Sequence, residues 1–201
     1  MLFRSGAWWT PWTSQLLHAD VAHLVTNLPV VAYCGYRVER ALGTGGLAVV
    51  GAAAVMGGTL AVTLMSALPV VGASILAFGF WGAQIAVGFR AHEPMPGEAR
   101  GFYGWGNLVL FLPLFLASLF GAGVSHAGHV GGLLGGVLAA SLVGAESFVP
   151  ASRVATRRTA NLRLAALLAA APMLLGPVAA RLAPMLALPE ESVAEIGRAH
   201  V

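Results

Sequence analysis

Hydrophobic positions along the chain form long runs without charge, separated by short polar segments. An apolar run over 21–38 follows Asp20, a candidate N-cap, and ends among charged residues at 37–40. No Asp, Glu, Lys or Arg occurs over 41–89 or over 101–145, and at about 20 residues per crossing each stretch has room for two membrane spans. The pattern predicts turns at 66–69 and 121–123 and a polar loop at 91–100.

The two ends of the chain add an interfacial segment and a further span. Residues 1–17 are broken by Pro11 and carry Trp8, Trp9 and Trp12, a cluster typical of a loop in the headgroup region. Pro29 is expected to kink the first span. A sixth span is predicted over 162–182, behind an arginine-rich linker.

The expected architecture is therefore an all-α, polytopic transmembrane helical bundle of about six spans with an interfacial N-terminal loop. We divide it into the loop over 1–17, a membrane core of five spans over 18–146, and a part over 147–201. This last part holds a cytoplasmic arginine-rich linker, the additional span and a short tail.

Composition supports a membrane location. Hydrophobic residues make up 58% of the 201 residues and charged residues 9%, with a mean hydropathy of +0.80, which is too apolar for an ordinary soluble domain. We expect a multi-pass protein of the cell membrane whose surroundings are the lipid bilayer. The net charge of +3 is small and scattered, so no nucleic-acid partner is expected.

The basic residues also predict an orientation. All 11 are arginine. Under the six-span arrangement eight fall on one side of the membrane, namely Arg37, Arg40, Arg90, Arg100, Arg153, Arg157, Arg158 and Arg163, and Arg4, Arg181 and Arg198 fall on the other. Because arginine is enriched in cytoplasmic loops, the first side is predicted to be cytoplasmic.

Four polar side chains are expected in one layer of the outer leaflet. His23 and Asn27, spaced i, i+4, lie near the start of the first span, and Ser74 and His129 lie near the starts of the third and fifth. At 1.5 Å per helical residue, Ser74 and His129 are both predicted about 10 Å below the outer surface. An unpaired polar group in hydrocarbon costs several kcal/mol, so these side chains should face one another.

Glycine spacing predicts close packing of the third and fifth spans. Glycines recur at 128, 132 and 136, at 131 and 135, and at 72, 79 and 82, and such stripes let helix backbones approach closely. Close approach would bring the Ser74 oxygen within hydrogen-bond reach of a His129 nitrogen. A serine needs this geometry if its proton is to be removed during attack on a carbonyl.

Four segments in this order resemble motifs of the rhomboid intramembrane serine proteases. The run 72–79 (GASILAFG) resembles the serine motif G-x-S-G with an aromatic residue four places after the serine, and 129–132 (HVGG) resembles the histidine motif. Residues 18–27 (HADVAHLVTN) resemble H-x-x-x-x-H-x-x-x-N, and 35–43 (GYRVERALG) resemble G-x-x-x-E-x-x-x-G. The resemblance covers roughly residues 8–144.

The resemblance implies a serine endopeptidase with a Ser/His dyad. Ser74 would be the nucleophile and His129 the general base, while the Ser74 N–H with the His23 and Asn27 side chains would hold the oxyanion. Substrates would be transmembrane proteins cut near the outer membrane face, and no metal or organic cofactor is implied. Oligomeric state is not indicated.

The sequence departs from the family pattern at three places. Ile75 stands where the motif has glycine, and its β-branched side chain would crowd a substrate or tilt the oxyanion-binding N–H. Thr10 follows Trp9 where the interfacial loop commonly has arginine. The family's first span is missing ahead of this loop, so either the start is truncated or the core has five spans and an extra one over 162–182.

Supporting roles and rival functions are open at this point. His126 is a candidate hydrogen-bonding or water-lining neighbour, Glu39 is expected to pair with an arginine, and His18 and Asp20 are expected to cap the first span or stiffen the loop. Ile75 makes an inactive rhomboid-like pseudoprotease, which binds transmembrane helices without cutting them, the main alternative. A second alternative is a metal transporter or metalloenzyme that uses histidines and Asp20 as ligands.

Overall fold

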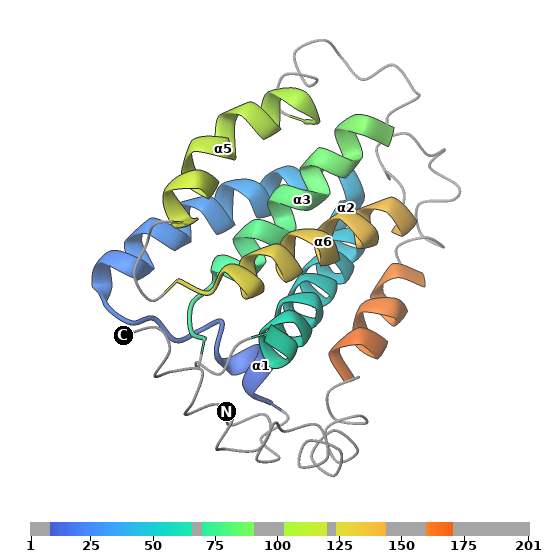
Figure 1. Cartoon of the computed structure of the whole chain (residues 1–201). Helices are drawn as coiled ribbons and strands as arrows, with labels where there is room; N and C mark the ends of the chain where they lie inside the picture. The colour runs from blue at the N-terminus through green and yellow to red at the C-terminus, as the bar shows by residue number, and fades with distance from the viewer. Residues whose placement is uncertain (1–8, 66–69, 91–102, 120–123, 144–159, 171–201) are drawn as a thin grey trace.

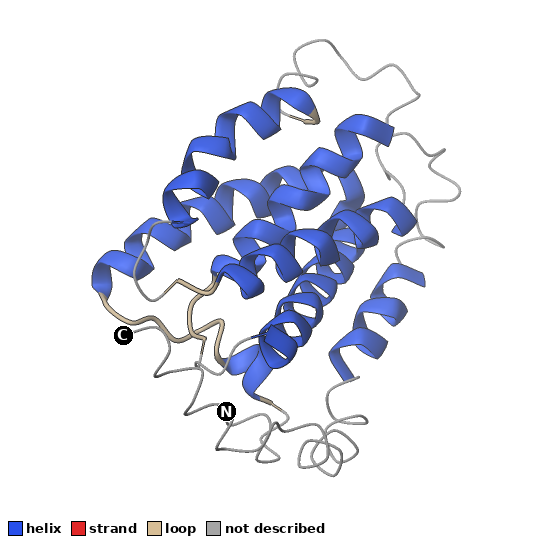
Figure 2. Cartoon of the chain, viewed as in Figure 1, coloured by secondary structure: helices blue, strands red, loops and turns tan. Residues whose placement is uncertain are grey.

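The computed structural model describes residues 9–65, 70–90, 103–119, 124–143 and 160–170, all of them helices or the segments beside them. Figure 2 shows helices joined by loops, with no strand in the described ranges. The all-α prediction is therefore confirmed for this part of the chain. The turns predicted at 66–69 and 121–123 and the loop at 91–100 lie outside the described residues.

The N-terminal segment forms a short helix where the sequence predicted a loop. Helix α1 covers Thr10–Thr13, and Pro11 lies in its first turn. Proline is tolerated there because the first amides of a helix have no intrahelical acceptor. Pro11 thus begins this helix instead of breaking the segment.

Helix α2, Val21–Met65, contains the first two predicted spans in one continuous run. Its one residue with non-helical dihedrals is Gly43, at φ 72° and ψ 171°, where two helices meet at a kink. Pro29 lies inside the helix and is not a residue with non-helical dihedrals, and the kink expected there stays a prediction. The charged residues at 37–40 are helical too, and the break comes at Gly43 because glycine adopts positive φ without steric cost.

The remaining helices are shorter than the predicted spans. Helix α3 covers Ser74–Arg90, α5 covers Trp105–Leu119 and α6 covers His126–Val143. A further helix over Ala160–Ala170 coincides with the start of the predicted sixth span, whose remainder is not described. By length and composition, α2 and α6 are the helices in the described ranges that could cross a membrane.

The core lies where α6 packs across α2 and α3 (Figure 1). Helix α5 borders α3 at one side of this group, and helix 160–170, drawn in orange, lies at the other and contributes Ala165 to the core. Buried polar contacts join α5 to its neighbours: Asn107 Nδ2 donates to Gln84 Oε1 at 3.1 Å, and Trp81 Nε1 donates to the Asn107 carbonyl at 3.3 Å.

Helix α6 approaches its neighbours through backbone, as the glycine pattern predicted. A Cβ on Gly136 would overlap the carbonyl oxygen of Gly79 on α3, and a Cβ on Gly131 would overlap that of Gly57 on α2. Gly82 lies equally close to the Leu133 carbonyl. The small-residue stripe of α6 therefore lies against two helices at once.

Candidate active site

The segment before α3 places Ser74 at the start of a helix. Gly72 has φ +112°, a conformation that favours glycine. Its N–H donates to the Ser14 carbonyl at 2.9 Å, and the Ala73 N–H donates to His18 Nε2 at 3.5 Å. Ser74 is thus the first residue of α3, not a residue well inside a span. The amides of the first helical turn, including that of Ser74, have no intrahelical acceptor.

His129 lies in the first turn of α6. Ser125 caps this helix by accepting the Gly128 N–H on its Oγ at 3.2 Å. The imidazole is 7% exposed and stacks on Phe78, with ring centroids 4.2 Å apart and an interplanar angle of 16°. Phe78 is the aromatic residue four places after Ser74, so one helix carries both the hydroxyl and the ring that holds the imidazole.

His23 and Asn27 lie one turn apart at the start of α2. Asp20 Oδ1 accepts the His23 N–H at 2.7 Å, which confirms that Asp20 caps this helix. His23 Nδ1 accepts the Ala19 N–H at 3.5 Å, and this hydrogen bond assigns the ring proton to Nε2. The Nε2 and Cε1 edge of the ring lies against Gly72, two residues before Ser74.

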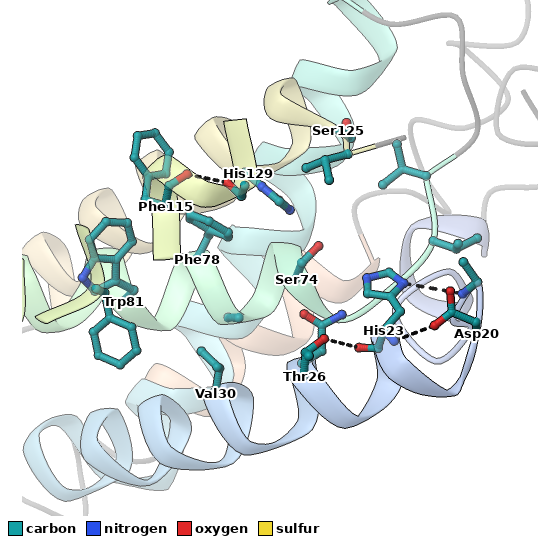
Figure 3. Close-up of a pocket in the computed structure, with 18 residues that line it drawn as sticks. Asp20, His23, Thr26, Val30, Ser74, Phe78, Trp81, Phe115, Ser125 and His129 are labelled. Atoms are coloured by element: carbon teal, nitrogen blue, oxygen red, sulfur yellow. Dashed lines mark hydrogen bonds between the residues drawn. The ribbon is translucent and has the colours of Figure 1, made fainter. Parts of the chain in front are cut away.

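These four side chains line one cavity of about 560 Å³. Figure 3 shows His129 and Ser74 projecting into it from α6 and α3, opposite His23 on α2. Its other lining residues are mostly apolar: Ala19, Asp20, Thr26, Val30, Val70, Val71, Ala77, Phe78, Trp81, Phe111, Phe115, Ser118, Val124 and Ser125. The cavity therefore has a polar edge, formed by the starts of three helices, and an aromatic wall.

Two buried polar atoms at this edge have no hydrogen-bond partner in the described part of the chain, namely Asn27 Nδ2 and His129 Nδ1. No hydrogen bond joins Ser74 to His129 either, although the two side chains share the cavity (Figure 3). A buried polar group without a partner costs about 1–3 kcal/mol. A ligand with an oxygen to accept from Asn27 would recover part of this cost.

Ile75 does not point into the cavity. Its side chain is 2% exposed and lies at the junction of α2, α3 and α6, against Gly58, Gly128 and Gly132. It is absent from the cavity lining. The side chain that was expected to crowd a substrate is therefore packed between helices, where glycines of α2 and α6 leave room for it.

The other predicted residues have different surroundings. His126 is exposed and is not part of the cavity lining. Glu39 lies outside the cavity too, and its Oε1 accepts a hydrogen bond from Thr44 Oγ1 at 2.9 Å. Gly72 does not thin the packing of α3 on α6 as predicted, since it precedes α3 and faces His23.

Sequence reasoning missed the contacts that brace the loop before Ser74. His18 was expected to cap the first span or stiffen the loop, and its ring accepts the Ala73 N–H and meets the His23 ring edge-on at 5.2 Å. The Ser14 carbonyl and the Ser125 cap were missed as well. A serine three residues before Gly128 was the available signal for the cap.

No group of three or more His, Cys, Asp or Glu side chains in the described ranges is arranged to hold a metal ion. The four side chains predicted for the site supply an alcohol, two imidazoles and an amide at the cavity edge. Such a set suits nucleophilic attack on a carbonyl.

Comparison with known proteins identifies the family. A rhomboid domain model matches residues 5–146. The chain belongs to the rhomboid family. Rhomboid proteins are integral membrane proteins, and the apolar helices α2 and α6 agree with that location.

Several curated relatives are rhomboid proteases by name. The chain is 32% identical over 144 residues to rhomboid protease GluP of Bacillus subtilis, covering 71% of this chain and 27% of that protein. It is 31% identical to rhomboid-like protease 3 of Toxoplasma gondii, covering 64% and 49%, and 31% identical to rhomboid protease GlpG of Photorhabdus laumondii, covering 66% and 46%. The chain thus spans less than half of the length of each of these relatives. No solved structure matches it.

Proposed function

We propose that this rhomboid is an intramembrane serine endopeptidase that cleaves transmembrane protein substrates near the outer membrane face. The observation that carries the proposal is the shared cavity: Ser74 and His129 line it from α3 and α6, and Asn27 directs an unpartnered donor to the same edge. Relatives named as proteases support the same activity.

In the proposed reaction, Ser74 Oγ attacks the scissile carbonyl while His129 accepts its proton. The imidazole would close onto Ser74 when substrate binds, since catalytic hydrogen bonds are often long in unliganded structures. The tetrahedral intermediate collapses, the C–N bond breaks, and His129 gives the proton to the leaving amine. Water then attacks the acyl ester by the same route in reverse, and Ser74 is regenerated.

The oxyanion of both intermediates would accept hydrogen bonds from three donors. These are the Ser74 N–H, the His23 Nε2–H and the Asn27 amide. The first has no intrahelical acceptor because Ser74 begins α3, and the second is assigned as a donor because Nδ1 accepts from Ala19. Stacking on Phe78 would keep the His129 ring in one plane through both half-reactions.

We also propose the six-span arrangement with the arginine-rich loops in the cytoplasm. The starts of α3 and α6 would then open to the outer leaflet, where water can reach Ser74. The substrates would be single-span proteins whose helix unwinds near that leaflet and exposes a peptide bond.

The test is covalent labelling of the purified, folded protein in detergent with a fluorophosphonate serine probe. We expect one modified residue, Ser74, with labelling lost in Ser74→Ala and in His129→Ala. Ser141, on the same helix as His129, gives a matched control variant, Ser141→Ala, which should label like the wild type.

Cleavage of a model transmembrane substrate is the second readout and should follow the same pattern. Folded wild-type protein that takes no label, cleaves nothing and still binds a transmembrane helix would contradict the protease proposal and support the pseudoprotease.

A further inference from the structure

Ile75 occupies the point where the helices that carry the proposed nucleophile and base come together. The residue follows Ser74 directly, and its side chain fills the junction of α2, α3 and α6. A Cβ built on Gly58 of α2 would lie 2.6 Å from Ile75 Cγ2 and 3.0 Å from its Cδ1. The same Cβ would lie 3.0 Å from the Gly128 carbonyl oxygen of α6, so the space that a side chain at 58 would take is filled mainly by Ile75 and is bounded by the backbone of α6.

The same side chain reaches the first turns of α6. A Cβ built on Gly128, the residue before His129, would lie 3.3 Å from Ile75 Cδ1. A Cβ built on Gly132 would lie 3.1 Å from Ile75 Cγ2. Cores are packed too densely to lose such a contact without movement. Removing the side chain would let the start of α6 shift toward α3 or α2, and His129 would move with it.

We infer that Ile75 is a positioning residue that sets the spacing between the starts of α3 and α6, and with it the separation of Ser74 and His129. Ile75 and Gly58 form a complementary pair, because the large side chain of Ile75 fills the space that is left by the missing side chain of Gly58. The inference rests on the proposed function for its catalytic meaning, while the spacing itself can be measured without activity.

The first experiment measures spacing. Spin labels are attached at Val71→Cys and Val130→Cys, which are 37% and 44% exposed and flank the two helix starts, while Cys34 is fully buried and stays in place. We expect one narrow distance distribution in the parent protein and a shifted or broadened one in Ile75→Ala. Leu76→Ala is the matched control, because Leu76 is the next residue on α3 and its Cδ2 lies against Gly51 of α2, whereas Ile75 lies against Gly58, Gly128 and Gly132. An unchanged distribution in Ile75→Ala would overturn the inference.

The second experiment measures the rate constant of Ser74 labelling by the fluorophosphonate probe, at a temperature where every variant is folded. Ile75→Ala should label about tenfold more slowly, since misplacing a catalytic group by a fraction of an ångström is that costly. Ile75→Val keeps Cγ2 and should stay within about threefold of the wild type. Leu76→Ala should lose thermal stability without losing rate, and an equal loss of rate in both alanine variants would contradict a specific role.

The complementary pair gives a third comparison. Gly58→Ala alone should slow labelling because its methyl group meets Ile75 Cγ2. In the Ile75→Ala background the same methyl group enters the vacated space and should raise the rate above that of Ile75→Ala. If wild-type protein takes no label, the proposed function fails, and the spin-label distances still decide whether Ile75 sets the spacing.

Discussion

At the scale of single residues, the polar edge of the cavity is built from atoms held in place by the backbone. His23 is oriented by Ala19 and Asp20, and Ser74 begins its helix because Ser14 and His18 hold the two preceding amides. Asn27 differs from these residues, because its Nδ2 is buried and has no partner among the residues that the structure describes. Its donor is available for a bound oxyanion at no cost of breaking an existing hydrogen bond.

Asn27→Ala should therefore lower kcat for a model transmembrane substrate by about 10²–10³-fold with a small change in KM, because a lost oxyanion donor acts mainly in the transition state. The control is Leu28→Ala, the next residue on α2, whose side chain is 60% exposed and outside the cavity lining. A loss in Asn27→Ala that appears only in KM would argue against an oxyanion role.

Gly72→Ala should disrupt the site although it replaces none of the proposed functional side chains. A Cβ at this position would lie 2.6 Å from His23 Cε1, and the φ of +112° is strained for alanine. We expect about 1–3 kcal/mol of destabilisation together with loss of labelling at Ser74. Thermal unfolding in detergent and probe labelling measure the two effects. Labelling at the wild-type rate would show that His23 has room to move.

At the scale of elements, α6 is held by backbone contact more than by side chains. Its glycines lie against α2 and α3, while Val130, Leu134, Leu138 and Leu142 form the exposed face of the same helix. Substitution should therefore have different consequences on the two faces, because the glycine face has no free space and the other face is largely exposed.

Gly136→Ala should destabilise the bundle by about 1–3 kcal/mol, since its methyl group would overlap the Gly79 carbonyl and one helix must shift. Leu138 lies on the other face and is 64% exposed, so Leu138→Ala should change the unfolding free energy by less than about 0.5 kcal/mol. Denaturant unfolding in micelles provides both values. A larger effect for Leu138→Ala than for Gly136→Ala would mean that the leucine face of α6, and not its glycine face, makes the tight contacts.

At the scale of the whole molecule, the orientation in the membrane decides which compartment reaches Ser74. The arginine distribution predicts that the loop at 91–100 and the linker at 153–163 are cytoplasmic. A cysteine introduced by His92→Cys in intact cells should resist a membrane-impermeant maleimide until the cells are opened. Val71→Cys, at the cavity, should react from outside, and the reverse pattern would invert the proposed topology.

The sequence by itself determined which segments are apolar, that they form helices in a membrane protein, and which four polar side chains belong to the rhomboid motifs. It also predicted that α6 packs through its glycines, because a stripe without side chains lets another helix backbone approach closely. The apolar segments and the glycine contacts follow from local composition and spacing, and the helices and packing of the described ranges agree with them. The assignment of the four polar side chains rests on the resemblance to the rhomboid motifs, and the match of a rhomboid domain model shows the family.

Only the tertiary structure decided how those segments face one another. The break at Gly43, the start of α3 at Ser74 and the direction of Ile75 depend on contacts between residues far apart in the chain. The pattern of apolar positions in a helix does not say which neighbouring helix each apolar side chain contacts. Which helix Ile75 meets depends on the glycines of α2 and α6, and their positions relative to α3 are set by packing.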